Sequence, residues 1–187
     1  MNVMHNIQFP MTWNDKDLDN FDWVETYMID EVPTTDRWDN FATDNKLKLE
    51  KLYIEKNLPK MCSKHYMCFS PQLSTGLQEI LNIFKDSTVH YNFLKLSPGY
   101  NVWMHYDSYS TFVKHNNISQ EKIDLVNRTA IFMTKSAPGQ VLQIGNEIFS
   151  NWTKGSSYTW QGQEWHGAAN FGFDELIVMQ VTWLKND

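Results

Sequence analysis

The chain has 187 residues, 42% of them hydrophobic, and a net charge of −6. This composition is typical of one globular domain and excludes a disordered chain, and no apolar run approaches the roughly 18 residues that span a bilayer. Of the 16 basic residues only Arg37 and Arg128 are arginines, so we expect no nucleic-acid surface, because such surfaces depend on arginine forks. Residues 1–10 lack the basic and apolar regions of a signal peptide, which predicts a soluble, cytoplasmic protein.

The first 88 residues show mixed helical and strand signals, and we interpret them as a support for the rest of the domain. Residues 15–28 carry an imperfect helical apolar face, whereas residues 45–58 fit a helix and a strand equally well. Further along, Ser74 is a good N-cap for a helix that ends near Asp86.

The remaining residues, 89–187, show short apolar runs separated by turn residues such as Pro98-Gly99 and Gly145-Asn146. A short helix is expected at 120–126, and strands are expected at 89–96, 102–106, 128–134, 141–144, 147–149, 158–160 and 176–184. Many short strands at this spacing predict a sandwich or a barrel. We therefore expect a single domain over residues 1–187, with a β-barrel core in its second half.

The two cysteines, Cys62 and Cys68, flank His65 in a Cys-x2-His-x2-Cys pattern. This pattern lacks the fourth nearby ligand of a structural zinc site, and two cysteines form no disulfide framework. We interpret them as reduced thiols.

The sharpest motif is His105-x-Asp107, followed 61 residues later by His166. Residues i and i+2 of a strand point to the same side, so His105 and Asp107 can share an ion. Two imidazoles and one carboxylate form the facial triad of non-haem Fe(II) enzymes, which leaves positions open for substrates and O2. We expect His166 to open the last barrel strand and barrel closure to bring it to the pair. The alternative is a strand histidine hydrogen-bonded to a nearby carboxylate.

The stretch from Phe93 to Asp107 resembles prolyl-hydroxylase-like members of the 2-oxoglutarate-dependent Fe(II) oxygenases, in which a strand, a Pro-Gly turn and His-x-Asp follow in this order. The stretch from His166 to Gly172 resembles their distal histidine with its trailing Asn and Gly. The resemblance covers roughly residues 89–184. It implies a mainly β (α+β) fold, namely a double-stranded β-helix (a jelly-roll or cupin-like barrel), with a mixed helical N-terminal part.

The same resemblance implies a dioxygenase that uses Fe(II), 2-oxoglutarate and O2 to hydroxylate an amino-acid, peptide or protein side chain. Its implied catalytic metal ligands are His105, Asp107 and His166. The protein's part in this chemistry is geometry and electrostatics, since the cofactors supply the oxidising power.

The family usually places an arginine or lysine after the distal histidine to pair the far carboxylate of 2-oxoglutarate, but this chain has Glu175-Leu176-Ile177 there. A buried dianion without a cation costs several kcal/mol. Other members carry the cation on a different strand, and a guanidinium suits the task. Arg128 is therefore the predicted cosubstrate residue, with Lys135 as the second choice. The alternative interpretation is that Arg128 is only a surface charge at the end of a strand.

Two other functions stay open at this point. One is a cupin-like metalloenzyme that uses the triad without 2-oxoglutarate. The other is a non-catalytic β-barrel module that binds a ligand or partner through aromatic residues. Several aromatic residues near the triad line a substrate pocket in one interpretation and form barrel core or rim in the other: Trp103, Tyr106, Tyr109, Trp160 and Trp165. The expected partner is a small-molecule or peptide substrate, and the oligomeric state stays open.

Overall fold

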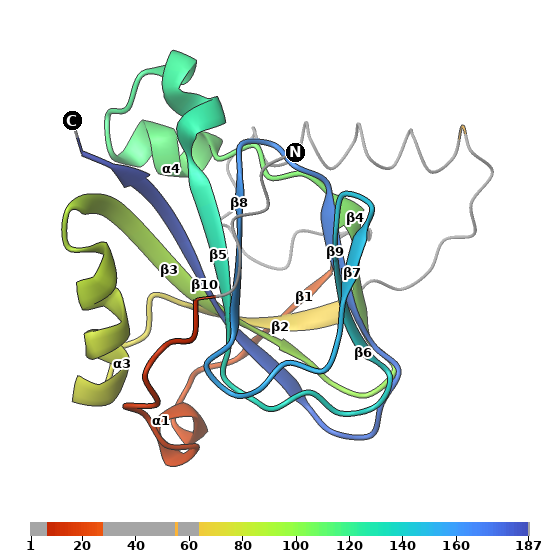
Figure 1. Cartoon of the computed structure of the whole chain (residues 1–187). Coiled ribbons are helices and arrows are strands. Elements are labelled where there is room, and N and C mark those ends of the chain that lie inside the picture. Colours follow the sequence, from red (N-terminus) through yellow and green to blue (C-terminus); the bar gives the residue numbers. More distant parts are fainter. Residues whose placement is uncertain (1–6, 28–54, 56–63, 187) are drawn as a thin grey trace.

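The computed structural model of the protein describes residues 7–27, 55 and 64–186. Two antiparallel β-sheets face each other, with short helices at their margins (Figure 1). The larger sheet contains, in spatial order, β1 (Val24–Tyr27), β2 (Lys64–Phe69), β3 (Ser87–Leu96), β10 (Leu176–Lys185), β5 (Asn127–Phe132) and β8 (Ser157–Gln161). The smaller sheet contains β4 (Asn101–His105), β9 (His166–Asn170), β6 (Gln140–Ile144) and β7 (Glu147–Phe149).

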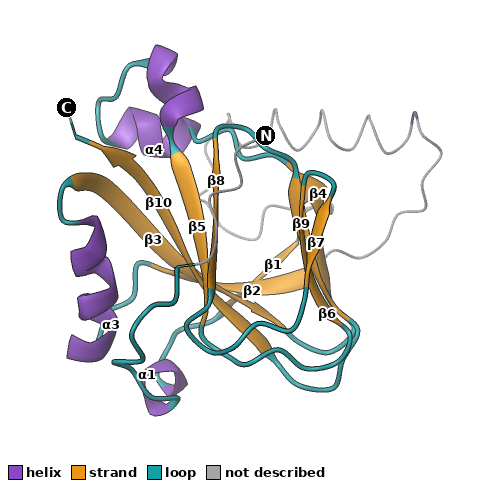
Figure 2. Ribbon diagram, viewed as in Figure 1, coloured by secondary structure: helices purple, strands orange, loops and turns teal. Residues whose placement is uncertain are grey.

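The path of the chain between the two sheets defines the fold. From β3 to β6 each successive strand lies in the opposite sheet, β6 and β7 form a hairpin, and β8, β9 and β10 alternate again (Figure 2). This alternation closes the sheets into a double-stranded β-helix, the jelly-roll arrangement. The predicted fold is thus confirmed, and the strands expected in the second half are all present with ends shifted by a few residues.

The helices follow local signals where these are strong. Ser74 caps α3 (Thr75–Leu81) by accepting a hydrogen bond from the Leu77 amide at 3.4 Å, and the 3-10 turn η1 (Asn82–Phe84) continues it. The expected helix at 120–126 is the 3-10 helix η2 (Gln120–Leu125). One further helix, α4 (Ser110–His115), was not predicted. None of the described helices is long and apolar enough to span a membrane.

The predicted helix over residues 15–28 is wrong for most of its length. Only α1 (Lys16–Asp19) is helical, and β1 follows it as an edge strand paired with β2, which was also not predicted. A short helix with an imperfect apolar face gains little stability from packing, whereas β1 satisfies its backbone groups by pairing with β2 in the larger sheet. The ambiguous segment 45–58 lies outside the described residues except for residue 55, as do Arg37 and Cys62.

Two apolar layers hold the domain together, one on each face of the larger sheet. The layer between the sheets includes Leu94, Phe132 and Val178, and the outer layer, under α1 and α3, includes Phe93, Ile131 and Met179. Strand β10 contributes to both layers, which explains its nearly continuous apolar sequence. The described cysteine, Cys68, is free and buried in the outer layer.

Gly76 in α3 permits a close approach between that helix and the N-terminal segment. A Cβ atom at this position would lie 2.0 Å from the carbonyl oxygen of Thr12, whose hydroxyl donates to the Gly76 carbonyl at 2.6 Å. We expect Gly76→Ala to lower the free energy of unfolding by about 1–3 kcal/mol, because overpacking against backbone outweighs the helix propensity that alanine adds. Urea denaturation checks this value, with the exposed Glu79→Ala in the same helix as the control. Equal or higher stability of Gly76→Ala would contradict the prediction.

Candidate metal centre

The structure brings His105, Asp107 and His166 together, and their candidate ligand atoms all lie within 4.8 Å of one another. His105 ends β4 and His166 begins β9, and the two residues are cross-strand partners in the smaller sheet. The Nε2 atom of His105 lies 3.9 Å from Oδ1 of Asp107, and Nε2 of His166 lies 3.7 Å from Oδ2. The three residues therefore surround one point at the end of the β4–β9 pair.

Two details of this arrangement differ from the sequence prediction. His166 begins β9, not the last strand, and β9 pairs directly with β4, whereas β10 lies in the other sheet. Asp107 lies just beyond the end of β4 rather than within it. Val102 and His105 are three residues apart, a spacing that normally places two side chains on opposite faces of a strand. A register shift between them lets the side chains of both Val102 and His105 line the cavity in the barrel interior.

Backbone hydrogen bonds set the orientation of both imidazole rings. Nδ1 of His105 donates to the Trp103 carbonyl at 2.7 Å, and Nδ1 of His166 donates to the Glu164 carbonyl at 2.9 Å. A carbonyl oxygen only accepts, so the proton of each neutral ring is on Nδ1 and the lone pair is on Nε2. Both Nε2 atoms are those that face Asp107, which is the orientation that a metal requires.

Electrostatics favour this protonation pattern. Burial, and secondly the nearby His105, lower the pKa of His166 to about 3, so its ring is neutral at pH 7. Burial alone would raise the pKa of Asp107, but Arg128 and the two histidines outweigh it and hold that pKa well below its usual value. Two imidazoles and one carboxylate fit Fe(II) and its neighbours in the first transition row better than Mg²⁺ or Ca²⁺.

The two cations predicted for the cosubstrate have different positions. Arg128 lies at the beginning of β5, and its Nη2 and Nε donate to Oδ2 of Asp107 at 2.7 and 3.1 Å, respectively. Its side chain is only 12% exposed, so it is not a surface charge. Lys135 is exposed and follows the opposite end of β5, roughly 20 Å along the chain at about 3.3 Å per residue. The structure thus brings Arg128, and not Lys135, to the triad.

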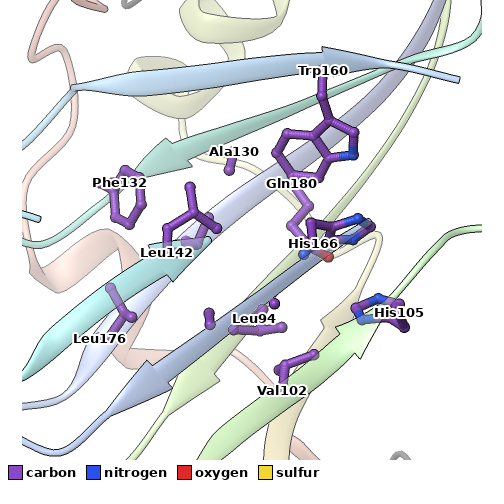
Figure 3. Close-up of a pocket in the computed structure, with 13 residues that line it drawn as sticks. Leu94, Val102, His105, Ala130, Phe132, Leu142, Trp160, His166, Leu176 and Gln180 are labelled. Atoms are coloured by element: carbon purple, nitrogen blue, oxygen red, sulfur yellow. The ribbon is translucent and has the colours of Figure 1, made fainter. Parts of the chain in front are cut away.

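A cavity between the two sheets begins at the triad histidines (Figure 3). Among its described lining residues none is a lysine or arginine, and apart from the histidines the polar side chains are Trp160 and Gln180. The Trp160 ring lies 4.6 Å from the His166 ring, centroid to centroid. The other lining residues are apolar or small: Leu94, Val102, Ala130, Phe132, Leu142, Gly167, Ala168, Leu176 and Val178.

Tyr109 adjoins the site in a way that its sequence position did not reveal. Its side chain is buried, its backbone is left-handed (φ 52°), and burial raises the pKa of its hydroxyl, which lies near Arg128 and Trp160. Left-handed backbone is uncommon for a bulky residue and concentrates at functional sites. The signal in the sequence was only its closeness to Asp107. Of the other aromatic residues near the triad, Tyr106 and Trp165 contact each other edge to face at 5.2 Å.

His65 is a residue of this region that sequence reasoning missed. It is 6% exposed, its Nδ1 has no hydrogen-bond partner among the described residues, and burial and the nearby His105 lower its pKa to about 4. It shares a face of β2 with Met67, which packs in the layer between the sheets, whereas Cys68 packs in the outer layer. His65 and Cys68 therefore point to opposite faces and do not share a metal.

Comparisons with known proteins add fold-level likenesses only. The chain matches no family model and no curated protein. Similar solved structures include a predicted oxalate decarboxylase from Thermotoga maritima (16% identity, 65% of this chain and 81% of that one, TM-score 0.40) and a cupin domain from Bordetella pertussis (18% identity, 51% and 80%, TM-score 0.36). KdgF from Halomonas sp. is 9% identical over 66% of this chain and 81% of that one, with a TM-score of 0.40. On its own strand topology, the chain is a double-stranded β-helix protein with a candidate His-Asp-His metal centre.

Proposed function

We propose that this protein is an Fe(II)-dependent dioxygenase that uses 2-oxoglutarate as cosubstrate and hydroxylates an amino-acid, peptide or protein side chain. The observation that carries the proposal is the triad, in which both histidines present Nε2 toward one carboxylate at the entrance of an apolar cavity. Three protein ligands leave coordination positions for a chelating cosubstrate and O2. The resemblance of residues 89–184 to the oxygenases supports the same function.

The residues of the site fit Fe(II) because two imidazole nitrogens and one carboxylate face a common point. Fe(II) bound by these residues would supply the activation of O2, whose two oxygen atoms would go to succinate, formed from 2-oxoglutarate with loss of CO2, and to the hydroxyl group of the substrate. His105 and His166 hold the metal through Nε2, and the backbone carbonyls of Trp103 and Glu164 keep both rings in place. The apolar cavity walls exclude water from the metal, which protects reactive species from side reactions.

Arg128 is the residue that we propose for the far carboxylate of the cosubstrate. A guanidinium carries five N–H donors, and two of them bind Asp107, which leaves donors for a second carboxylate. The burial of Arg128 would strengthen its ion pair with the far carboxylate of 2-oxoglutarate, since salt screens buried charges only weakly. The substrate itself, and the cytoplasmic location, stay predictions.

The test is an anaerobic titration of the metal-free protein with Fe(II) and then with 2-oxoglutarate. We expect a visible charge-transfer band that requires both additions and is absent in His105→Ala. No response to either addition would contradict the proposal.

A cosubstrate analogue tests the role of Arg128. The probe 2-oxopentanoate keeps the chelating end of 2-oxoglutarate and lacks the far carboxylate, so the wild-type protein should bind it at least about 10-fold more weakly, in line with 1.5–3 kcal/mol for a charged hydrogen bond. Arg128→Ala should reduce this preference to near unity. A preference that survives the substitution would assign the far carboxylate to another residue.

One observation favours a second function, a cupin-like metalloenzyme that does not use 2-oxoglutarate. The described cavity walls carry no lysine or arginine, and the guanidinium of Arg128 already binds Asp107. The same titration separates the two functions, because this enzyme would bind Fe(II) without any response to 2-oxoglutarate.

A further inference from the structure

The contact between Arg128 and Asp107 gives the arginine a role at the metal centre itself. We infer that Arg128 is a positioning residue that occupies Oδ2 of Asp107, so that this carboxylate binds the metal through Oδ1 alone and one more coordination position stays open. The inference rests on the proposed metal centre and does not depend on 2-oxoglutarate.

The geometry of the contact is one-sided. Both donors of Arg128, Nη2 and Nε, reach the same oxygen, at 2.7 and 3.1 Å, instead of spanning the two oxygens of the carboxylate. The other oxygen, Oδ1, accepts no hydrogen bond from the described residues and lies 3.9 Å from Nε2 of His105, whereas Oδ2 also lies 3.7 Å from Nε2 of His166. Both oxygens therefore face the site, but the guanidinium competes with a metal for Oδ2 only.

Arg128 is held where it is by the structure around it. It lies on β5 between the two cross-strand partners Thr182 and Trp160, and its side chain is 12% exposed. Its Cζ lies 5.7 Å from the centre of the Tyr109 ring, and Tyr109 packs in a buried cluster with Phe112. With a neighbour on each side and little room toward solvent, the guanidinium stays against Asp107.

The consequence concerns the number of open positions on the metal. Carboxylates bind metals through one oxygen or through two, and the second mode occupies an additional position. With Oδ2 held by Arg128, the protein contributes one atom from each of three residues, and the remaining positions stay open. Without Arg128, the nearby Oδ2 becomes free to bind the metal as well.

Bound Mn(II) provides a direct readout, since its exchangeable water ligands can be counted from the broadening of its electron paramagnetic resonance lines in ¹⁷O-enriched water. We expect Arg128→Ala to retain Mn(II) with one exchangeable water fewer than the wild-type protein. Adding Asp107→Asn to Arg128→Ala should restore the missing water, because a carboxamide coordinates through its single oxygen. Arg128→Met, which keeps much of the aliphatic packing and removes all donors, repeats the measurement if Arg128→Ala does not fold.

The outcomes separate this inference from the proposed function. An unchanged water count in Arg128→Ala or Arg128→Met overturns the positioning role, even if these variants are less stable. A wild-type protein that binds no Mn(II), or binds it equally well after His105→Ala, overturns the metal centre and the inference together, and that result appears before any Arg128 variant is compared.

Discussion

His105→Ala is expected to lower the affinity for Fe(II) by more than about 100-fold, because loss of an outer-shell partner alone costs 10–100-fold and this substitution removes a ligand atom. His105 is one of the three residues whose donor atoms meet at the site, and its Nε2 is oriented by the bond from Nδ1 to Trp103. Anaerobic calorimetric titration with Fe(II) measures the affinity.

The fold should survive this substitution. His105 lies at the last position of β4, and its side chain is partly exposed, so its loss leaves no closed cavity in either apolar layer. The control is His115→Ala, at the exposed end of α4 and outside the triad, which should bind Fe(II) like the wild-type protein. If His105→Ala bound Fe(II) with unchanged affinity, the three residues would not form a metal centre.

The second large effect is a loss of stability in mild acid. The pKa of His65 is about 4 and that of His166 is about 3 in the folded chain, in both cases mainly because of burial, against an ordinary value of 6.5. The unfolded chain therefore binds protons first as the pH falls. The free energy of unfolding of the metal-free protein is highest above pH 6.5 and decreases as the pH falls from there toward 4.

The expected size is about 2–3 kcal/mol for each of these histidines between pH 7 and pH 4.5, since one pKa unit corresponds to about 1.4 kcal/mol. The lowered pKa of Asp107 adds to the loss only at still lower pH, below the ordinary carboxyl range. Urea denaturation at the two pH values provides the measurement. His65→Gln should reduce the difference by about 2–3 kcal/mol, because it removes one of the buried histidines whose pKa is lowered.

A wild-type protein that is equally stable at pH 7 and pH 4.5 would contradict the buried, neutral state of both rings. A His65→Gln variant with the full pH dependence would assign the effect to His166 and its neighbours. Bound metal should make the dependence steeper, because protons compete with the metal for Nε2 of His105 and His166.

Most strands in the second half of the chain could be predicted from the local pattern of apolar and turn residues. Short apolar runs and turn residues identified β3, β5 and β10, because these signals act over a few residues. The His-x-Asp spacing and the later His166 likewise identified residues that the structure brings together. The strands were predictable because their signals lie within one strand or turn. The site residues were predictable because their types suit a metal.

Other features were decided by contacts between distant segments. Val24–Tyr27 is a strand because β2 pairs with it, and His166 meets His105 because β9 and β4 are neighbours in the smaller sheet. The contact of Arg128 with Oδ2 of Asp107, and the burial of His65 near His105, also depend on which strands face each other. The sequence by itself determined most strands of the second half, a sandwich or barrel as the fold class, and the types of the site residues, since these follow from local periodicity and chemistry. Only the tertiary structure decided the pairing partners, the oxygen that Arg128 holds and the buried histidine beside the site, because each depends on long-range packing that no local spacing encodes.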